Sequence, residues 1–256
     1  MNNEKIYTAA IVVIGNEVLS GRVQDLNVNY LALGLKDQGI RLREVRIIPD
    51  VKKTIVECVN ELRAQHDYVF TTGGIGPTHD DITAESIAAA FDVALECNPQ
   101  AAAMLEQYYG DRINAGRLRM ANIPAGGELL DNPVSFAPGF RLHNVYVLPG
   151  VPRIMQAMFD TFKHRLAGGR PVRSRTVNAF IGESVVAAGL AAIQDRYDDV
   201  EIGSYPFVRQ ERFGCALVAR SVDLTRLAEA AEAIAALLRG LGVEPQISDG
   251  ESTPSG

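Results

Sequence analysis

Two adjacent carboxylates, Asp80 and Asp81, lie shortly after a glycine-rich stretch at 73–77 (GGIGP). Backbone N–H groups in such a loop, beside the start of a helix, favour anions such as phosphate. Carboxylates next to a phosphate repel it unless a hard divalent cation binds both groups. The spacing therefore predicts metal-assisted chemistry on a phosphate, with Asp80 and Asp81 as metal ligands. The structural alternative is a tight turn in which one aspartate only caps the helix.

Further polar side chains follow two stretches that read as strands, at 8–14 and 41–48. Glu17 comes shortly after the first stretch and Asp50 after the second, while Asn27 ends an Asp-Leu-Asn triplet. Ligands in parallel α/β sheets bind at the carboxyl ends of the strands, so we expect these side chains in one site. Glu17 or Asp50 is a candidate base that deprotonates water. The alternative is again structural, because Asp50 and Asn27 could each cap a helix.

Basic side chains are fewer than acidic ones among the candidates. Arg117 and Arg119 lie in an irregular segment, and an arginine fork suits a phosphate, although solvated surface arginines are common. His79 is a weaker candidate ligand, since loop histidines usually face water. A pure anion site would present mainly cations and N–H groups. The excess of carboxylates therefore favours a metal-dependent attack on a pyrophosphate whose oxygens are held by the backbone of residues 74–76.

The elements that must position these side chains alternate between strands and helices. Residues 8–14 read as a strand buried on both faces of a sheet, because their apolar run is continuous. Residues 68–72 read as a strand because they are apolar and β-branched. The alternation predicts a three-layer α/β domain with a mostly parallel sheet over residues 1–167. The other expected elements are strands at 41–48 and 145–148 and helices at 27–38, 52–66, 83–91, 99–115 and 154–166.

A cluster of helix and strand breakers at 167–171 marks a boundary. Beyond it, the order strand, helix, strand, strand, helix predicts a small α+β domain over 172–245. Its last helix, at 224–241, has one apolar face that we expect to pack on the sheet. Residues 246–256 are polar and are expected to be a frayed tail.

Composition excludes several classes of protein. The chain has 47% hydrophobic and 22% charged residues and a net charge of −6, so nonspecific binding to nucleic acid is not expected. We expect no membrane association and a cytoplasmic location, since no leader pattern is visible at the start and no apolar run approaches roughly 18 residues. The three cysteines, Cys58, Cys97 and Cys215, have no metal-ligand spacing and are expected to be buried thiols.

Several sequence elements resemble, in order, those of the MoaB/MogA-like molybdopterin-binding domain family. The resemblance is strongest to the branch that contains the N-terminal domains of CinA proteins and of eukaryotic FAD synthases. It covers the first expected domain, and its number of matching elements makes it specific. The elements are GNEVLSG at 15–21, DLN at 25–27, GGIGPTHDDIT at 73–83, APGF at 137–140 and LPGVP at 148–152.

The resemblance implies a ligand that is either molybdopterin or a nucleotide, two flat heterocycles that carry phosphate. The favoured function is metal-dependent hydrolysis of the diphosphate linkage of ADP-ribose or FAD, with Mg²⁺, Mn²⁺ or Co²⁺. The alternatives are a molybdopterin-binding protein without turnover and an interaction module with a relict pocket. The family implies a homo-oligomer, either a dimer or a trimer. Residues expected to bind the phosphate or nucleotide are Asn27, Gly73, Gly74, Ile75, Gly76, Thr78, Arg119, Pro149 and Gly150.

The sequence also departs from the family pattern in two segments that shape the expected pocket. Ser135 and Phe136 stand where CinA-type relatives usually have Gly-Thr, and residues 119–122 (RMAN) replace a Lys-Gln-Ala-like run. Both departures leave the identity of the substrate open.

Overall fold

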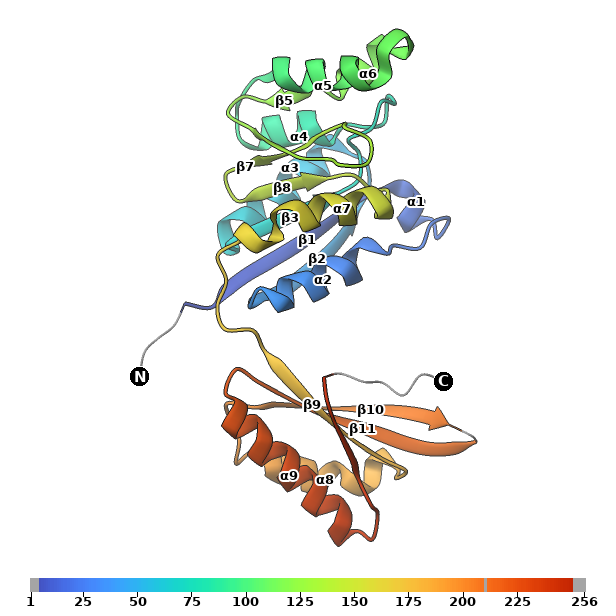
Figure 1. Cartoon of the computed structure of the whole chain (residues 1–256), viewed down its shortest axis with the longest axis vertical. Helices are drawn as coiled ribbons and strands as arrows, with labels where there is room; N and C mark the ends of the chain where they lie inside the picture. The colour runs from blue at the N-terminus through green and yellow to red at the C-terminus, as the bar shows by residue number, and fades with distance from the viewer. Residues whose placement is uncertain (1–4, 210, 251–256) are drawn as a thin grey trace. The chain divides into compact units, whose positions relative to one another are not determined.

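The computed structural model describes residues 5–209 and 211–250. Contacts within the chain divide it into two compact units, Met1–Gly169 and Arg170–Gly256 (Figure 1). The division falls inside the breaker cluster at 167–171. Each unit has its own sheet and its own buried core.

The first unit is built on a six-stranded sheet with the order β2-β1-β3-β8-β7-β6. Neighbouring strands from β2 to β8 in this order are parallel, whereas β7 and β6 are antiparallel additions at one edge. The predicted mostly parallel α/β sheet is thus confirmed. The strands are β1 (Tyr7–Ile14), β2 (Ile40–Ile48), β3 (Tyr68–Thr72), β6 (Glu128–Leu130), β7 (Gly139–Leu142) and β8 (Val145–Leu148).

Helices cover both faces of this sheet, which gives three layers (Figure 1). Alternate residues of β1 enter two separate cores: Val12 packs with helices α3 and α4, and Ile11 with α2 and α7. Both side chains are fully buried, which explains the continuous apolar run of β1. The helices are α1 (Asn16–Leu19), α2 (Asn27–Asp37), α3 (Lys52–Gln65), α4 (Thr83–Ala90) and α7 (Pro152–Phe162).

The segment between α4 and β6 differs from its expected form. The predicted helix at 99–115 is split into α5 (Pro99–Tyr109) and α6 (Ala115–Arg119), because Gly110 has a φ of 51° and ends the first helix. Asn98 and Asn114 cap the two helices by accepting backbone N–H groups at 3.0 and 2.9 Å. Two short strands, β4 (Leu95–Cys97) and β5 (Asn122–Pro124), form an antiparallel ribbon.

The second unit contains a four-stranded sheet with the order β10-β11-β9-β12 and two helices on one of its faces (Figure 1). The predicted order of its first five elements is confirmed, including the hairpin between β10 and β11. Its elements are β9 (Arg173–Ala179), α8 (Glu183–Gln194), β10 (Glu201–Arg209), β11 (Arg212–Ser221), α9 (Leu224–Gly240) and β12 (Gln246–Asp249).

The expectation of a frayed tail from residue 246 is wrong for residues 246–249. They form β12, which pairs antiparallel with β9 and closes the edge that β9 would otherwise expose. Two side-chain contacts hold it: Arg175 Nε lies 2.9 Å from Asp249 Oδ1, and the Thr176 hydroxyl donates to the Gly250 carbonyl at 2.7 Å. Residues 251–256 lie outside the described part of the chain.

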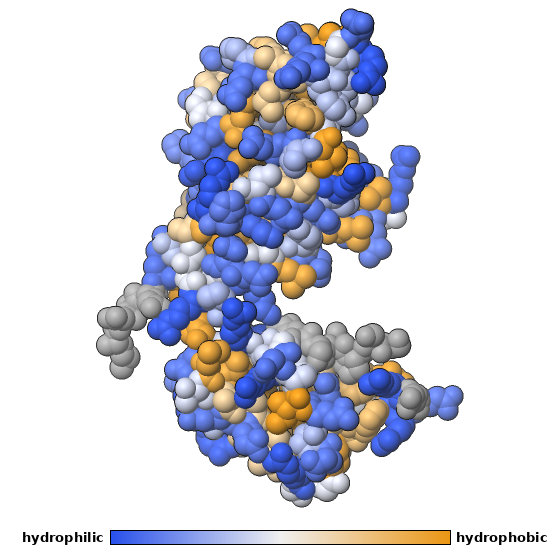
Figure 2. Space-filling view, in the orientation of Figure 1, coloured by the Kyte–Doolittle hydropathy of each residue, from blue (hydrophilic) through white to orange (hydrophobic). Residues whose placement is uncertain are grey.

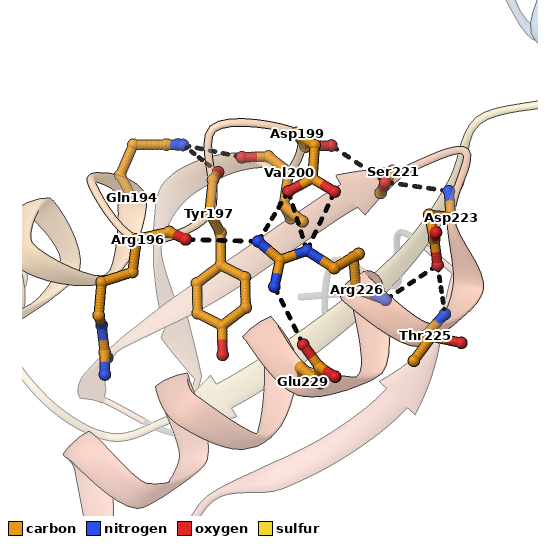
Figure 3. A network of polar contacts seen from close by, with 10 residues as sticks. All are labelled: Gln194, Arg196, Tyr197, Asp199, Val200, Ser221, Asp223, Thr225, Arg226 and Glu229. Atoms are coloured by element: carbon orange, nitrogen blue, oxygen red, sulfur yellow. Dashed lines mark hydrogen bonds and ion pairs between the residues drawn. The ribbon is translucent and has the colours of Figure 1, made fainter. Parts of the chain in front are cut away.

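A polar network joins the end of α8, the loop before β10, the end of β11 and the start of α9 in the second unit (Figure 3). Arg226 Nε donates to both carboxylate oxygens of Asp199 at 3.1 Å, and its Nη1 donates to Glu229 at 3.1 Å. The hydrogen bond from Arg226 lowers the pKa of the Asp199 carboxyl. Beneath the network, the apolar face of α9 packs on the sheet as predicted, with Leu227 and Ile234 buried.

Two further features were expected from the sequence. Cys58 and Cys215 are buried as expected, and burial raises the pKa of each thiol, but Cys97 on the short strand β4 is exposed. No helix within residues 5–209 and 211–250 is long and apolar enough to cross a membrane.

Candidate active site

The loops that follow the parallel strands of the first unit are tied together by short contacts. The Gly15 N–H donates to the carbonyl at the end of β2, Ile48, at 3.1 Å, and the Gly73 N–H donates to Leu148 at the end of β8, also at 3.1 Å. Asp50 accepts the Asn16 N–H at 2.8 Å. The structure therefore ties the loop after β1, which carries Glu17, to Asp50 after β2, and it links the glycine loop to the end of β8.

Gly73 and Gly150 approach each other closely in this cluster of loops. Gly73 has a φ of 103°, and a Cβ built on it would lie 2.2 Å from the Ile14 carbonyl oxygen. A Cβ on Gly150 would lie 3.4 Å from Gly73 Cα. Only glycine fits the backbone path at position 73, where both the conformation and the available space exclude a side chain.

Asn27 lies beside Gly150 at the start of α2. Its side chain is 3% exposed, and its Nδ2 donates to the Gly150 carbonyl at 2.9 Å. Its Oδ1 and the hydroxyl of Thr72, the last residue of β3, are buried without a hydrogen-bond partner within the described residues. Unpartnered buried polar atoms are costly unless a water or a ligand group satisfies them. Asn27 does not cap α2 through its side chain, because that cap role falls to Asp25, which accepts the Val28 N–H at 2.8 Å.

The glycine loop after β3 is held by the start of α4. Thr83 donates its hydroxyl to the Gly73 carbonyl and its N–H to the Gly74 carbonyl, both at 3.0 Å. A Cβ on Gly74 would lie 2.2 Å from that hydroxyl, at a φ of 67°. A Cβ on Gly76 would lie 2.7 Å from Asp81 Oδ2. The two glycines thus leave room for the Thr83 and Asp81 side chains respectively.

Asp81 closes a turn and also faces the site. Its Oδ2 accepts the Thr78 N–H at 2.8 Å and the Thr78 hydroxyl at 2.6 Å. Its Oδ1 makes no hydrogen bond within the described residues. The tight turn that was the structural alternative for Asp81 is therefore present. It fixes the direction of the Asp81 carboxylate and leaves Oδ1 available to a ligand.

Asp80 and His79 are placed differently. Their side chains are 68% and 96% exposed, and His79 Nδ1 lies 3.9 Å from Asp80 Oδ1. The Thr78 side chain lowers the pKa of the Asp80 carboxyl, although the ordered contact of that hydroxyl is the one to Asp81. No group of three or more His, Cys, Asp or Glu side chains within residues 5–209 and 211–250 is arranged to hold a metal ion. The metal role of Asp80 and Asp81 stays a prediction.

A cavity of about 80 Å³ runs along the glycine loop. It brings together residues 74–76 of the loop, Asp81 and Arg119, whereas the expected site residues Gly73 and Thr78 do not line it. Glu17, Asp50, Asn27, Pro149 and Gly150 do not line it; they lie at the neighbouring strand ends. Its lining residues are Gly74, Ile75, Gly76, Asp81, Ala84, Glu85, Leu95, Arg119, Met120, Asn122, Ile123, Pro138 and Phe140.

Glu85 is a site residue that the sequence analysis missed. It lies on the first turn of α4, while Asp81 lies just before that helix, and both residues line the cavity. The place of Glu85 on the first turn of the helix that follows the glycine loop was a usable signal. Lys52 Nζ lies 3.6 Å from one Glu85 oxygen across the surface.

The remaining candidates divide between ligand binding and structure. The Glu17 carboxylate is exposed and folds back over Gly15, on which a Cβ would lie 2.4 Å from Glu17 Oε1. Arg117 donates to the Arg112 carbonyl and stacks 4.3 Å above the Tyr109 ring, so its role is structural. Arg119 is the arginine that reaches the cavity.

Comparisons with known proteins match both units. Residues 10–168 match the family described as "Probable molybdopterin binding domain", and residues 171–246 match "FAD synthase, middle domain". A probable FAD synthase of Caenorhabditis briggsae is 30% identical over 264 residues, which cover 91% of this chain and 49% of that protein. A CinA-like protein of Desulfosudis oleivorans is 33% identical over 208 residues, which cover 74% of this chain and 50% of that protein.

A solved structure supports the first of these matches. The crystal structure of CinA from Thermoplasma acidophilum, described as a protein of unknown function, is 31% identical with a TM-score of 0.59. The alignment covers 62% of this chain and 98% of that one. The present chain spans about half the length of the two named sequence relatives.

Proposed function

Because the chain belongs to the probable molybdopterin binding domain family, we propose that it is an enzyme that hydrolyses the diphosphate linkage of a nucleotide such as ADP-ribose or FAD, with a divalent metal. The observation that carries this proposal is that the glycine loop, Asp81 and Arg119 line the same cavity. The relatives named as FAD synthase and CinA-like support a nucleotide as the ligand.

The chain's own groups divide the work on the diphosphate. Backbone N–H groups of residues 74–76 donate to phosphate oxygens, and Arg119 offsets their charge. Asp81 and Glu85 both line the cavity, and their carboxylate oxygens, with those of the nearby Asp80, would hold a hard cation such as Mg²⁺, Mn²⁺ or Co²⁺. When bound, such a metal offsets phosphate charge and lowers the pKa of water. Thr78 keeps the Asp81 carboxylate oriented throughout.

The small cavity holds only part of such a substrate. Pockets for small molecules span roughly 300–1,000 Å³, so a nucleotide diphosphate must extend beyond 80 Å³. Gly73 of the glycine loop lies against Gly150, and Gly150 lies beside Asn27, whose Oδ1 has no hydrogen-bond partner within the described residues. We propose that Asn27 binds a second polar group of the substrate. Glu17, which is exposed there, or Asp50, which is held by the Asn16 N–H, acts as the base for water.

An assay of the purified protein against a panel of dinucleotides and divalent metals tests this function. We expect metal-dependent release of mononucleotides. Asp81→Asn and Glu85→Gln should each lower turnover on the order of 10²-fold or more, because each removes an anionic ligand with little change in size. Glu57→Gln, on the exposed face of α3, is the matched control and should leave turnover unchanged. Absence of turnover with every metal, or parent-like turnover of Asp81→Asn, would contradict the proposal.

A second candidate function is molybdopterin binding without turnover. The observation that favours it is the exposure of Asp80 together with the lack, among the described residues, of three grouped metal ligands. The same loop and arginine would then hold the phosphate of a pterin. Pterin fluorescence that co-purifies with the parent protein and is lost in Gly76→Val, with no hydrolysis by either, is the result expected for this function.

A further inference from the structure

A cavity of the second unit has a volume of about 330 Å³ and is lined by residues of β9, β10 and β12 together with Phe180 and Glu244. Val177 and Ala179 of β9 pack in the core beneath α8 and α9. Asn178, between them, therefore points to the opposite face of the sheet, where the cavity lies. The cavity belongs to the second unit alone, because all of its lining residues come from positions 178–248.

Two aromatic rings form a corner of this cavity. The Phe180 and Phe207 ring centroids are 5.8 Å apart and their planes are inclined by 72°. Gly214 lets the Phe207 ring lie against the backbone of β11, since a Cβ there would be 2.4 Å from Phe207 Cζ. The Arg212 guanidinium lies 4.2 Å from the Phe180 ring centroid. Both rings are thus held in place, and a corner of this kind offers one face for stacking and one edge for an inclined contact.

The cavity is also lined by polar side chains that can donate or accept hydrogen bonds. Asn178 Oδ1 is buried and has no hydrogen-bond partner within the described residues, so a ligand N–H would satisfy it. Arg209 has no ion-pair partner among those residues and offers a guanidinium to an anion. Glu244 supplies a carboxylate that suits sugar hydroxyls.

We propose that this cavity binds a mononucleotide. The base stacks in the corner of Phe180 and Phe207 and donates an N–H to Asn178, while the phosphate pairs with Arg209. The volume lies at the small end of the range for ligand sites and fits one nucleotide rather than two. The acidic chain, with a net charge of −6, disfavours a nucleic-acid strand as the source of the base. The proposal does not depend on the function assigned to the first unit, which shares no residue with this site.

Amide NMR of the whole chain tests the proposal at the site itself, because residues 178–179 of β9 and 246–248 of β12 line the cavity. Titration with AMP should shift the backbone amide signals of these residues to saturation. Asn178→Leu and Phe207→Leu should weaken the binding at least tenfold. Phe213→Leu is the matched control, because Phe213 is 76% exposed and does not line the cavity. The affinity of this variant for AMP should equal that of the parent.

Two further comparisons test whether Arg209 binds the phosphate and whether the base comes from a mononucleotide or from a nucleic-acid strand. Arg209→Gln should weaken binding of AMP but not of adenosine, since only the former carries the anion. The spectrum of each variant also reports whether it is folded. Absence of saturable shifts at millimolar AMP would overturn the proposal. So would equal affinity in a folded Phe207→Leu, or a response to a single-stranded oligonucleotide but not to AMP. Nucleotide turnover by the first unit affects none of these readouts when Asp81→Asn is used as the background.

Discussion

Gly76 and Asp81 form a pair in which the lack of a side chain at one position makes room for a carboxylate at the other. Gly76 does not have a positive φ, so alanine there would not strain the backbone. Its Cβ would lie 2.7 Å from Asp81 Oδ2 and displace the carboxylate from Thr78. We expect Gly76→Ala to lower turnover at least tenfold, about 1.4 kcal/mol, with unfolding free energy changed by less.

The comparison with Gly74→Ala makes the test specific. Gly74 has a φ of 67° and its Cβ would lie 2.2 Å from the Thr83 hydroxyl, so this variant should lose about 1–3 kcal/mol of stability. Urea unfolding and turnover of both variants separate the two effects. If Gly76→Ala were as active as the parent, the position of the Asp81 carboxylate beside Gly76 would not matter for turnover, and the prediction would be wrong.

Asp199 provides a residue-scale prediction for pH. Its pKa is lowered by the hydrogen bond from Arg226, so the interaction stabilises the folded state above the unfolded pKa of about 3.9. This stabilisation is lost as the pH falls through the lower pKa of the folded state. The parent should therefore be more stable than Asp199→Asn at pH 7, and the difference should shrink between pH 4 and pH 2. Thermal unfolding across that range would refute the assignment if the difference stayed constant.

At the scale of elements, α2 and α7 cross at Gly34. A Cβ on Gly34 would lie 2.4 Å from Cε1 of the fully buried Phe159 ring. Alanine is favoured over glycine inside a helix by about 1 kcal/mol, but overpacking costs typically 1–3 kcal/mol. We expect Gly34→Ala to destabilise the protein by about 1 kcal/mol, as measured by urea unfolding.

Two matched variants check the cause. Gly240→Ala, in α9, meets no atom within 4 Å and should not destabilise the protein. Gly34→Ala combined with Phe159→Leu should be less destabilised than the sum of the single variants, because the smaller side chain relieves the clash. Strict additivity in that double variant would show that the ring is not the obstacle.

The elements that could be predicted are those whose pattern is local. The run at 8–14 is apolar because β1 is buried on both faces, and the stripe of α9 is apolar because it covers a sheet. Strands β4, β5, β6, β7 and β12 were missed because each is only three or four residues long, too short for a local pattern, and forms through its pairing partner. The same reason explains the site: the glycine loop and Asp81 carry a local motif, whereas the place of Arg119 and Leu95 on the cavity wall depends on the β4–β5 ribbon.

At the scale of the whole molecule, self-association is the open prediction. Several apolar side chains of the first unit are about half exposed, among them Leu19 at 52%, Leu26 at 54% and Val151 at 55%. Figure 2 shows apolar residues in small groups on a mainly hydrophilic surface. We expect a homo-oligomer, a dimer or a trimer, that buries some of these side chains. Light scattering over a dilution series measures it, and a constant mass of 27.7 kDa at micromolar concentration would contradict it.

The pairing of β9 with β12 has a consequence for biosynthesis. Thr176 reaches its partner Gly250 across 74 positions of sequence. A ribosome that adds about 5–20 residues per second needs roughly 4–15 s to cover that distance. The first unit can complete its sheet on the nascent chain before then, whereas β9 waits with one edge unpaired. The second unit therefore passes through a translational window in which chaperones, or a neighbouring nascent chain, compete with β12 for the same strand edge.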